Sequence, residues 1–120
     1  MNIFLFIFRM NLQPDAQPDA TQMKTYMTQW TQWIGDMENA GQLAPGGNHL
    51  SARGKVLYSD GRTRPTPFIE DGTSVAGYIL ILAKSIDEAT IIAEKCPLLN
   101  GKNTSVEIRA TAAPGLANNI

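Results

Sequence analysis

Two stretches of this sequence are decisive for the fold: Ile3-Phe4-Leu5-Phe6-Ile7-Phe8-Arg9 and Ala76-Gly77-Tyr78-Ile79-Leu80-Ile81-Leu82-Ala83. Aromatic and β-branched residues dominate the first stretch, and the second is a run of apolar residues, so we expect each to form a strand. Alternate side chains of a strand point to opposite faces of the sheet, and here both sets are apolar. An antiparallel sheet with one wet face would instead alternate apolar and polar residues. The two stretches therefore predict a sheet that is covered on both faces.

The segment after the first strand predicts a long helix and then a loop. Met, Tyr and Trp side chains recur every three or four residues between positions 23 and 37, which is typical of a helix with one apolar face. Asp19 is its expected N-cap, with Gln22 as the capping-box partner, and Gly41 is the expected left-handed end. The glycine-rich segment 41–50 is predicted to be a loop, and the second strand is expected over about 52–58.

The C-terminal half carries turn, helix and strand signals in order. Asp60-Gly61 predicts a hairpin turn and Asp71-Gly72 a second turn. Ser85 is the expected cap of a second helix, which Pro97 ends. Residues 104–110 alternate strictly between polar and apolar side chains and predict the last strand of the sheet.

This β-α-β-β-α-β order predicts an α+β, ferredoxin-like fold over residues 1–112, with an antiparallel sheet and both helices on one face. The tail 113–120 is expected to be flexible. The chain has no further element to cover the second apolar face, and proteins rarely leave so large a patch exposed. We therefore expect a homodimer that packs sheet against sheet with two-fold symmetry.

Composition excludes several classes of site. The 120-residue chain has one cysteine, Cys96, and one histidine, His49, so it has no intrachain disulfide and no His/Cys zinc site of its own. A net charge of −1 argues against nucleic acid as a partner. The apolar run at 3–8 is too short to span a membrane, and no basic segment precedes it as in a signal peptide. We expect a cytoplasmic protein, and no phosphate or dinucleotide fingerprint predicts a cofactor.

An ordered set of short motifs between about residues 3 and 110 resembles the YCII-related family, specifically its DGPF-domain branch. That family implies a ferredoxin-like dimeric α/β barrel of mostly unassigned role, and some members lie beside extracytoplasmic-function sigma factors. The motifs are Trp30, Gly41-x-Leu43-x-x-Gly46-x-x-His49, Pro67-Phe68-x-Glu70, Gly77-Tyr78, Cys96-Pro97 and Val106-Glu107-Ile108-Arg109.

The chain departs from the family pattern where relatives carry chemistry. The Asp and Gly of the DGPF motif fall on Pro65 and Thr66, and the Lys-Glu pair falls on Gly72 and Thr73. A catalytic His proposed for some relatives falls near Trp30. The resemblance therefore implies the shared scaffold and carries over no acid–base pair.

Polar and aromatic residues near the predicted sheet are candidates to line a small-molecule pocket. They are Arg9, Trp30, His49, Arg53, Phe68, Glu70, Tyr78, Glu107 and Arg109. Glu70 could accept hydrogen bonds, or act as a base if burial raised its pKa. Arg109 or Arg53 could hold a carboxylate through two parallel hydrogen bonds, and His49 could titrate near neutrality.

Each candidate also has a purely structural interpretation. Glu107 and Arg109 could form a cross-strand ion pair, and Trp30 could belong to the core. Basic residues on the hairpin could keep its edge from aggregating. Three functions follow from these readings: a homodimeric small-molecule binding or sensing domain, a cofactor-independent enzyme that uses the barrel cleft, and a regulatory partner linked to transcription. Convergence of Glu70, His49 and Arg109 on one pocket would favour the first two, and solvent exposure of all three would favour the third.

Overall fold

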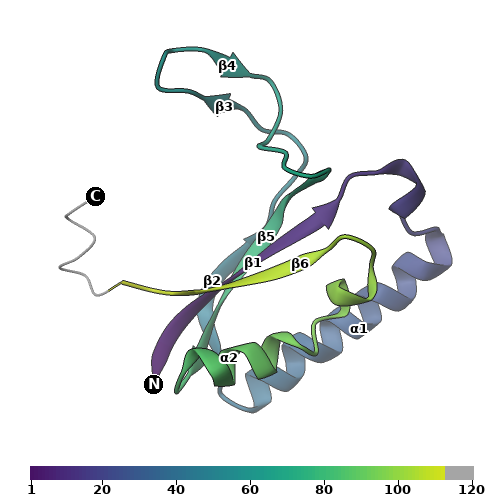
Figure 1. The fold of residues 1–120 in the computed structure, drawn as a ribbon. Helices are drawn as coiled ribbons and strands as arrows, with labels where there is room; N and C mark the ends of the chain where they lie inside the picture. The colour runs from purple at the N-terminus through teal and green to yellow at the C-terminus, as the bar shows by residue number, and fades with distance from the viewer. Residues whose placement is uncertain (113–120) are drawn as a thin grey trace.

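The computed structural model describes residues 1–112 of the 120-residue chain, and the predicted flexible tail lies outside the described residues. The elements of the described part are β1 (Asn2–Asn11), the 3-10 helix η1 (Pro14–Ala16), α1 (Ala20–Asn39), β2 (Leu43–His49), β3 (Val56–Leu57), β4 (Thr63–Arg64), β5 (Thr73–Ala83), α2 (Ile86–Ala93), the 3-10 helix η2 (Pro97–Asn100) and β6 (Ser105–Ala110) (Figure 1).

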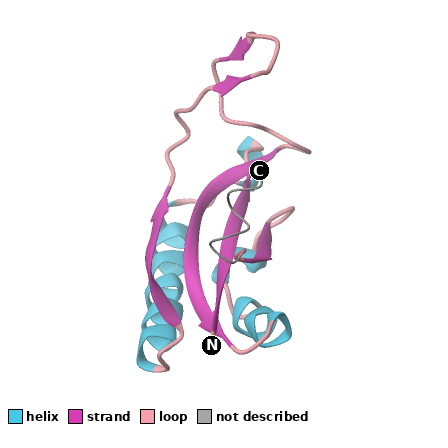
Figure 2. Ribbon diagram, turned by 90° about the vertical axis from the view of Figure 1, so that its left-hand side faces the viewer, coloured by secondary structure: helices cyan, strands magenta, loops and turns pink. Residues whose placement is uncertain are grey.

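Four strands form one antiparallel sheet in the order β2-β5-β1-β6. The two strands predicted to be apolar on both faces, β1 and β5, are the central ones. Figures 1 and 2 show α1 and α2 on the same side of this sheet. The α+β class and the antiparallel sheet with two helices are confirmed, and the arrangement is compatible with a ferredoxin-like fold.

The core lies between the sheet and the two helices. Phe4, Phe6 and Phe8 alternate along β1 toward the helices and are all buried. The Phe6 ring stacks on Trp33 of α1 at 6.4 Å between ring centroids and 10° between planes. The Trp33 indole Nε1 donates a hydrogen bond to the Ile92 backbone oxygen at 3.2 Å, which joins α1 to α2.

The opposite side of the sheet is also apolar, and we call it the open face. The register places Leu5 beside Leu80 and Ile7 beside Tyr78 on the two central strands. Within residues 1–112 both helices lie on the other side of the sheet (Figures 1 and 2). The open face is formed by Ile3, Leu5 and Ile7 of β1 and by Tyr78, Leu80 and Leu82 of β5.

The predicted helix starts are confirmed, whereas α2 ends at Ala93 and not at Pro97, which instead begins η2. Asp19 Oδ1 accepts from the Gln22 backbone N at 2.7 Å and Gln22 Oε1 accepts from the Asp19 backbone N at 2.9 Å, so the capping box of α1 is complete. Gly41 follows the helix with a φ of +69°. The Ser85 hydroxyl accepts from the Glu88 backbone N at 3.1 Å and begins α2. These local signals work because capping depends on residues within one turn of each other.

The prediction of a loop over 41–50 is wrong, because Leu43–His49 forms β2 and pairs with β5. Gly46 and Gly47 have φ values of +110° and +102° and lie where the register shifts. A Cβ on Gly47 would stand 2.7 Å from the Tyr78 backbone oxygen. The glycines therefore form a bulge that brings two backbones close together, and they do not end the strand.

The prediction of a sheet strand over 52–58 is wrong as well. Only Val56–Leu57 is extended, and it pairs with Thr63–Arg64 in a separate two-stranded sheet. The predicted turn at Asp60-Gly61 is confirmed and closes this hairpin, with Gly61 at a φ of +90°. Residues 50–69, which we call the arm, extend away from the four-stranded sheet (Figures 1 and 2).

The predicted turn at Asp71-Gly72, where the chain returns from the arm to the sheet, is confirmed. Asp71 and Gly72 have φ values of +52° and +73°, as the predicted turn requires. The turn is closed by two backbone hydrogen bonds of 2.9 Å between Glu70 and Thr73. β5 begins directly at Thr73, three positions before the predicted start at Ala76.

Candidate functional site

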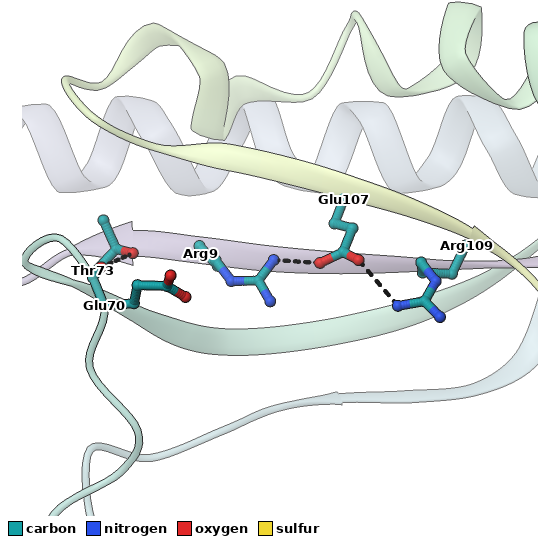
Figure 3. Close-up of polar contacts among 5 residues, drawn as sticks. All are labelled: Arg9, Glu70, Thr73, Glu107 and Arg109. Atoms are coloured by element: carbon teal, nitrogen blue, oxygen red, sulfur yellow. Dashed lines mark hydrogen bonds and ion pairs between the residues drawn. The ribbon is translucent and has the colours of Figure 1, made fainter.

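Three ionic side chains from β1 and β6 form a row on the open face. Arg9 Nη1 lies 2.6 Å from Glu107 Oε1, and Arg109 Nη1 lies 3.2 Å from Glu107 Oε2 (Figure 3). The register explains the contact: Glu107 is the partner of Ile7 and Arg109 the partner of Leu5, so these side chains share a face with the apolar residues of β1. We call these three residues the ionic row.

The ionic row is charged and partly shielded from water. The side chains of Arg9 and Glu107 are each 33% exposed, whereas that of Arg109 is 66% exposed. The hydrogen bond from Arg9, and after it the bond from Arg109, holds the pKa of Glu107 below its ordinary value of 4.5. Glu107 is therefore an ionised acceptor with each oxygen bound to one guanidinium, and the row carries one surplus positive charge.

Glu70 lies at the end of this row. Figure 3 shows its carboxylate beside the Arg9 side chain, although no hydrogen bond joins the two. The residue is exposed and stands where the arm meets β5, with its backbone bridged to Thr73. Tyr78, the partner of Ile7 across β1 and β5, lies on the same face and is 37% exposed. The structure thus places five of the nine predicted site residues along the open face.

Trp30 and His49 lie together on the opposite side of the sheet. The ring centroids of Trp30 and His49 are 6.0 Å apart, and the edge of Trp30 meets Phe8 of the core at 5.0 Å. Trp30 is partly buried against the hydrophobic core. His49 therefore contacts the helix side of the sheet, whereas Glu70 stands beside Arg9 (Figure 3). The structure does not bring His49 and Glu70 together.

Arg53 and Phe68, the two remaining candidates, belong to the arm. Both are exposed, and the Phe68 side chain is 57% accessible. The Phe68 backbone oxygen accepts a hydrogen bond of 2.9 Å from the Ser74 hydroxyl, which ties the base of the arm to β5.

Sequence reasoning missed two grooves on the helix side. One, of about 830 Å³, runs between α1 and α2 over Trp33 and Ile92. The other, of about 600 Å³, lies between α1, η2 and the segment around η1 and includes Tyr26. Burial, and after it the charge of Cys96, raises the pKa of Tyr26 to about 12. No signal in the sequence could have located these grooves, since each forms between segments far apart in the chain, and none of the nine candidates lines them.

Cys96 follows α2 and is buried in the core. Burial raises the pKa of its thiol to about 12. Over residues 1–112, no three His, Cys, Asp or Glu side chains gather as a metal ion would require. In the same part of the chain, no helix has the length and apolar character needed to cross a membrane.

Comparison with known proteins adds no relative to this picture. The sequence matches no protein-family model, and a search of curated proteins finds no significant similarity. The site is therefore interpreted from its own geometry.

Proposed function

We propose that this chain is a homodimeric small-molecule binding domain. In this proposal the open faces of two copies pack together, and the ionic rows that they enclose hold a ligand that carries a carboxylate. The observation that carries the proposal is the position of the ionic row: Arg9, Glu107 and Arg109 lie on the same face as the apolar side chains of β1.

The apolar character of the open face supports the dimer. Ile3 is 42% exposed and Tyr78 37% exposed, and Leu5, Ile7, Leu80 and Leu82 lie between them along two paired strands. Soluble proteins seldom leave a contiguous apolar patch of this kind in water. A second copy has the same apolar surface, and a two-fold axis pairs the surface with itself. We extend the proposal to a dimeric α/β barrel and to membership of the YCII-related family, which the ordered motifs favour.

The charge of the ionic row supports an anionic ligand. Two guanidinium groups share the Glu107 carboxylate, so one positive charge has no ion-pair partner among Arg9, Glu107 and Arg109, and the Glu70 carboxylate beside Arg9 offsets it without pairing (Figure 3). Packing a second sheet over the row would remove water from it, and an unpaired charge is costly in such surroundings. A carboxylate on the ligand would neutralise that charge and accept the remaining N–H donors of Arg9 or Arg109 in parallel pairs.

The placement of His49 and Glu70 does not favour an enzyme, whereas the exposure of Glu70, His49 and Arg109 is the feature expected of a regulatory interaction partner. An enzyme that uses His49 and Glu70 as an acid–base pair would need them adjacent, and they are not. A regulatory protein linked to transcription would need a partner surface for which the described contacts give no specific sign.

Ligand binding can be measured by calorimetry with acetate, succinate and citrate as probes. We expect at least one carboxylate to bind the full chain, and Arg9→Gln and Arg109→Gln each to weaken that binding at least tenfold. Lys24→Gln, an exposed cation on α1, is the matched control and should leave binding unchanged. Equal affinity in the wild type and in both row variants, or no binding of any of the three probes, would reject the proposed site.

A further inference from the structure

We propose that the arm, residues 50–69, is an exchanged clasp that lies across the second copy of the chain. The inference rests on the proposed dimer. It adds a second contact between the two copies, made by the arm of each copy on the surface of the other. It accounts for the exposure of Leu57, the most exposed large apolar side chain among residues 2–112, and of Phe68, also in the arm.

The arm carries more exposed apolar surface than an isolated hairpin can keep in water. Leu57 is 73% exposed and Phe68 57% exposed, followed by Leu50 at 46% and Ile69 at 38%. A two-stranded hairpin is marginally stable alone and needs a surface to pack on. Among residues 1–112, β3 pairs with β4 alone, and the hairpin is closed by hydrogen bonds such as that from the Tyr58 backbone N to the Arg62 oxygen at 2.8 Å. Figures 1 and 2 show it extended away from its own sheet and helices.

The charge of the arm is complementary to that of the rest of the chain. The arm contains four basic residues and one acidic residue, whereas the remaining positions contain six basic and ten acidic residues. The arm therefore carries a net charge of +3 and the rest of the chain −4, in agreement with the total of −1. An arm that contacts a second copy brings opposite charges together as well as burying Leu57 and Phe68.

The base of the arm is continuous with the proposed interface. Glu70, the first residue after the arm, lies beside Arg9 in the ionic row (Figure 3). A copy packed on the open face therefore begins where the arm leaves the sheet. The arm needs to make no long turn to reach that copy.

Nucleic acid fits the arm less well than a second copy does. Phosphates would satisfy the cations but would leave Leu57 and Phe68 in water. Tyr58, an aromatic residue that could stack on a base, already has the Arg62 guanidinium over its ring at 5.9 Å. The combination of apolar and basic side chains favours a protein surface of opposite charge.

Photo-crosslinking tests the clasp directly. A photoreactive benzoylphenylalanine takes the place of Leu57 in an equal mixture of isotopically light and heavy chains, and the mass of crosslinked peptides identifies the two chains. We expect light–heavy crosslinks from position 57 to residues within 1–49 or 70–112. The same probe in place of Ile91, which is 59% exposed on α2, should give none above background.

A charge-reversal variant provides the second readout. Lys55→Glu combined with Arg64→Glu should raise the dimer dissociation constant at least tenfold at low salt, and the difference should shrink in 1 M NaCl. A double variant at two helix-side cations, Lys24→Glu with Lys95→Glu, is the matched control and should leave the constant within twofold.

The outcomes separate this inference from the proposed function. A stable dimer whose arm crosslinks stay within one chain would reject the clasp and leave the dimer standing. A chain that sediments as a monomer at all concentrations would reject both. Binding of duplex DNA that the charge reversal abolishes, with the dimer constant unchanged, would assign the arm to nucleic acid and overturn the clasp.

Discussion

Arg9 and Glu107 stand 98 positions apart in the sequence and form an ion pair of 2.6 Å across two neighbouring strands. The pair ties β6, at the edge of the sheet, to the central strand β1. It also puts an ionised carboxylate and a guanidinium among apolar side chains, on a face that the helices of the same chain do not cover. The position of this pair connects the stability of the sheet with the proposed ligand site.

The Glu107→Gln substitution should reduce the loss of unfolding free energy that the wild type shows as the pH falls. The pKa of Glu107 is lower in the folded chain than its ordinary value of 4.5, so its ionised form stabilises the fold above about pH 4.5. That contribution is lost as the pH falls through the lower folded pKa. Since the pair is partly exposed, we expect about 0.5–1 kcal/mol. Urea unfolding of wild type and Glu107→Gln between pH 3 and 7 measures the difference.

The two curves should converge at the acid end and separate near neutrality. Glu94→Gln, at the exposed C-cap of α2, is the control and should follow the wild type throughout. A Glu107→Gln curve parallel to the wild type across the whole range would contradict the role given to Arg9.

Two glycines should respond to alanine in opposite directions. Gly47 has a φ of +102°, and a Cβ there would meet the Tyr78 oxygen at 2.7 Å, so Gly47→Ala should destabilise the chain by more than 1 kcal/mol. Gly35 lies within α1 with nothing in the way of a Cβ, so Gly35→Ala should stabilise by about 0.5–1 kcal/mol. Thermal and urea unfolding would compare them. The same sign for both variants would contradict the bulge in β2.

Truncation of Trp33 should cost more than any other single change considered. Its ring is buried on Phe6, and its indole N–H bonds Ile92, so Trp33→Ala removes both contacts and leaves a cavity. We expect a loss of about 3–5 kcal/mol in the free energy of unfolding. Ile91→Ala, at a side chain 59% exposed, should change it by less than about 0.5 kcal/mol. Similar losses of unfolding free energy in Trp33→Ala and Ile91→Ala would contradict the position of Trp33 in the core.

Cys96 should be nearly inert in the folded chain. Its thiol is buried with a pKa raised to about 12, and the thiolate is the species that reacts. Labelling by iodoacetamide at pH 8 should therefore be more than a hundredfold slower than in 6 M guanidinium chloride. Rates within a few-fold of each other would mean that the end of α2 opens freely.

The elements that could be predicted from sequence are those fixed by local chemistry. The capping box of α1 and the alternation along β1 and β5 depend on residues within a few positions of each other, and they are borne out. β2 could not be predicted, because the Gly46-Gly47 pair is typical of a loop in sequence. The requirement for glycine comes from the close approach of the Tyr78 backbone, which only the folded structure shows. Because β2 occupies the edge of the sheet beside β5, the strand predicted over 52–58 does not pair there.

The candidate site was predictable only within one strand. Strict alternation puts Glu107 and Arg109 on one side of β6, which the sequence alone indicates. The contact with Arg9 depends on the register between strands at the two ends of the chain, and no local pattern encodes it. The contact of His49 with Trp30 depends likewise on β2, the strand that the sequence did not reveal.

Sedimentation equilibrium of the full chain tests the central claim, the pairing of two open faces, most directly. The account predicts a particle of about twice the 13.1 kDa chain mass at micromolar concentration. Leu5→Asp and Ile3→Asp, on the open face, should each give folded single chains by circular dichroism, whereas Ile91→Asp on the helix side should remain a dimer. A wild-type mass of one chain at every concentration, or dimers that persist in both folded open-face variants, would contradict it.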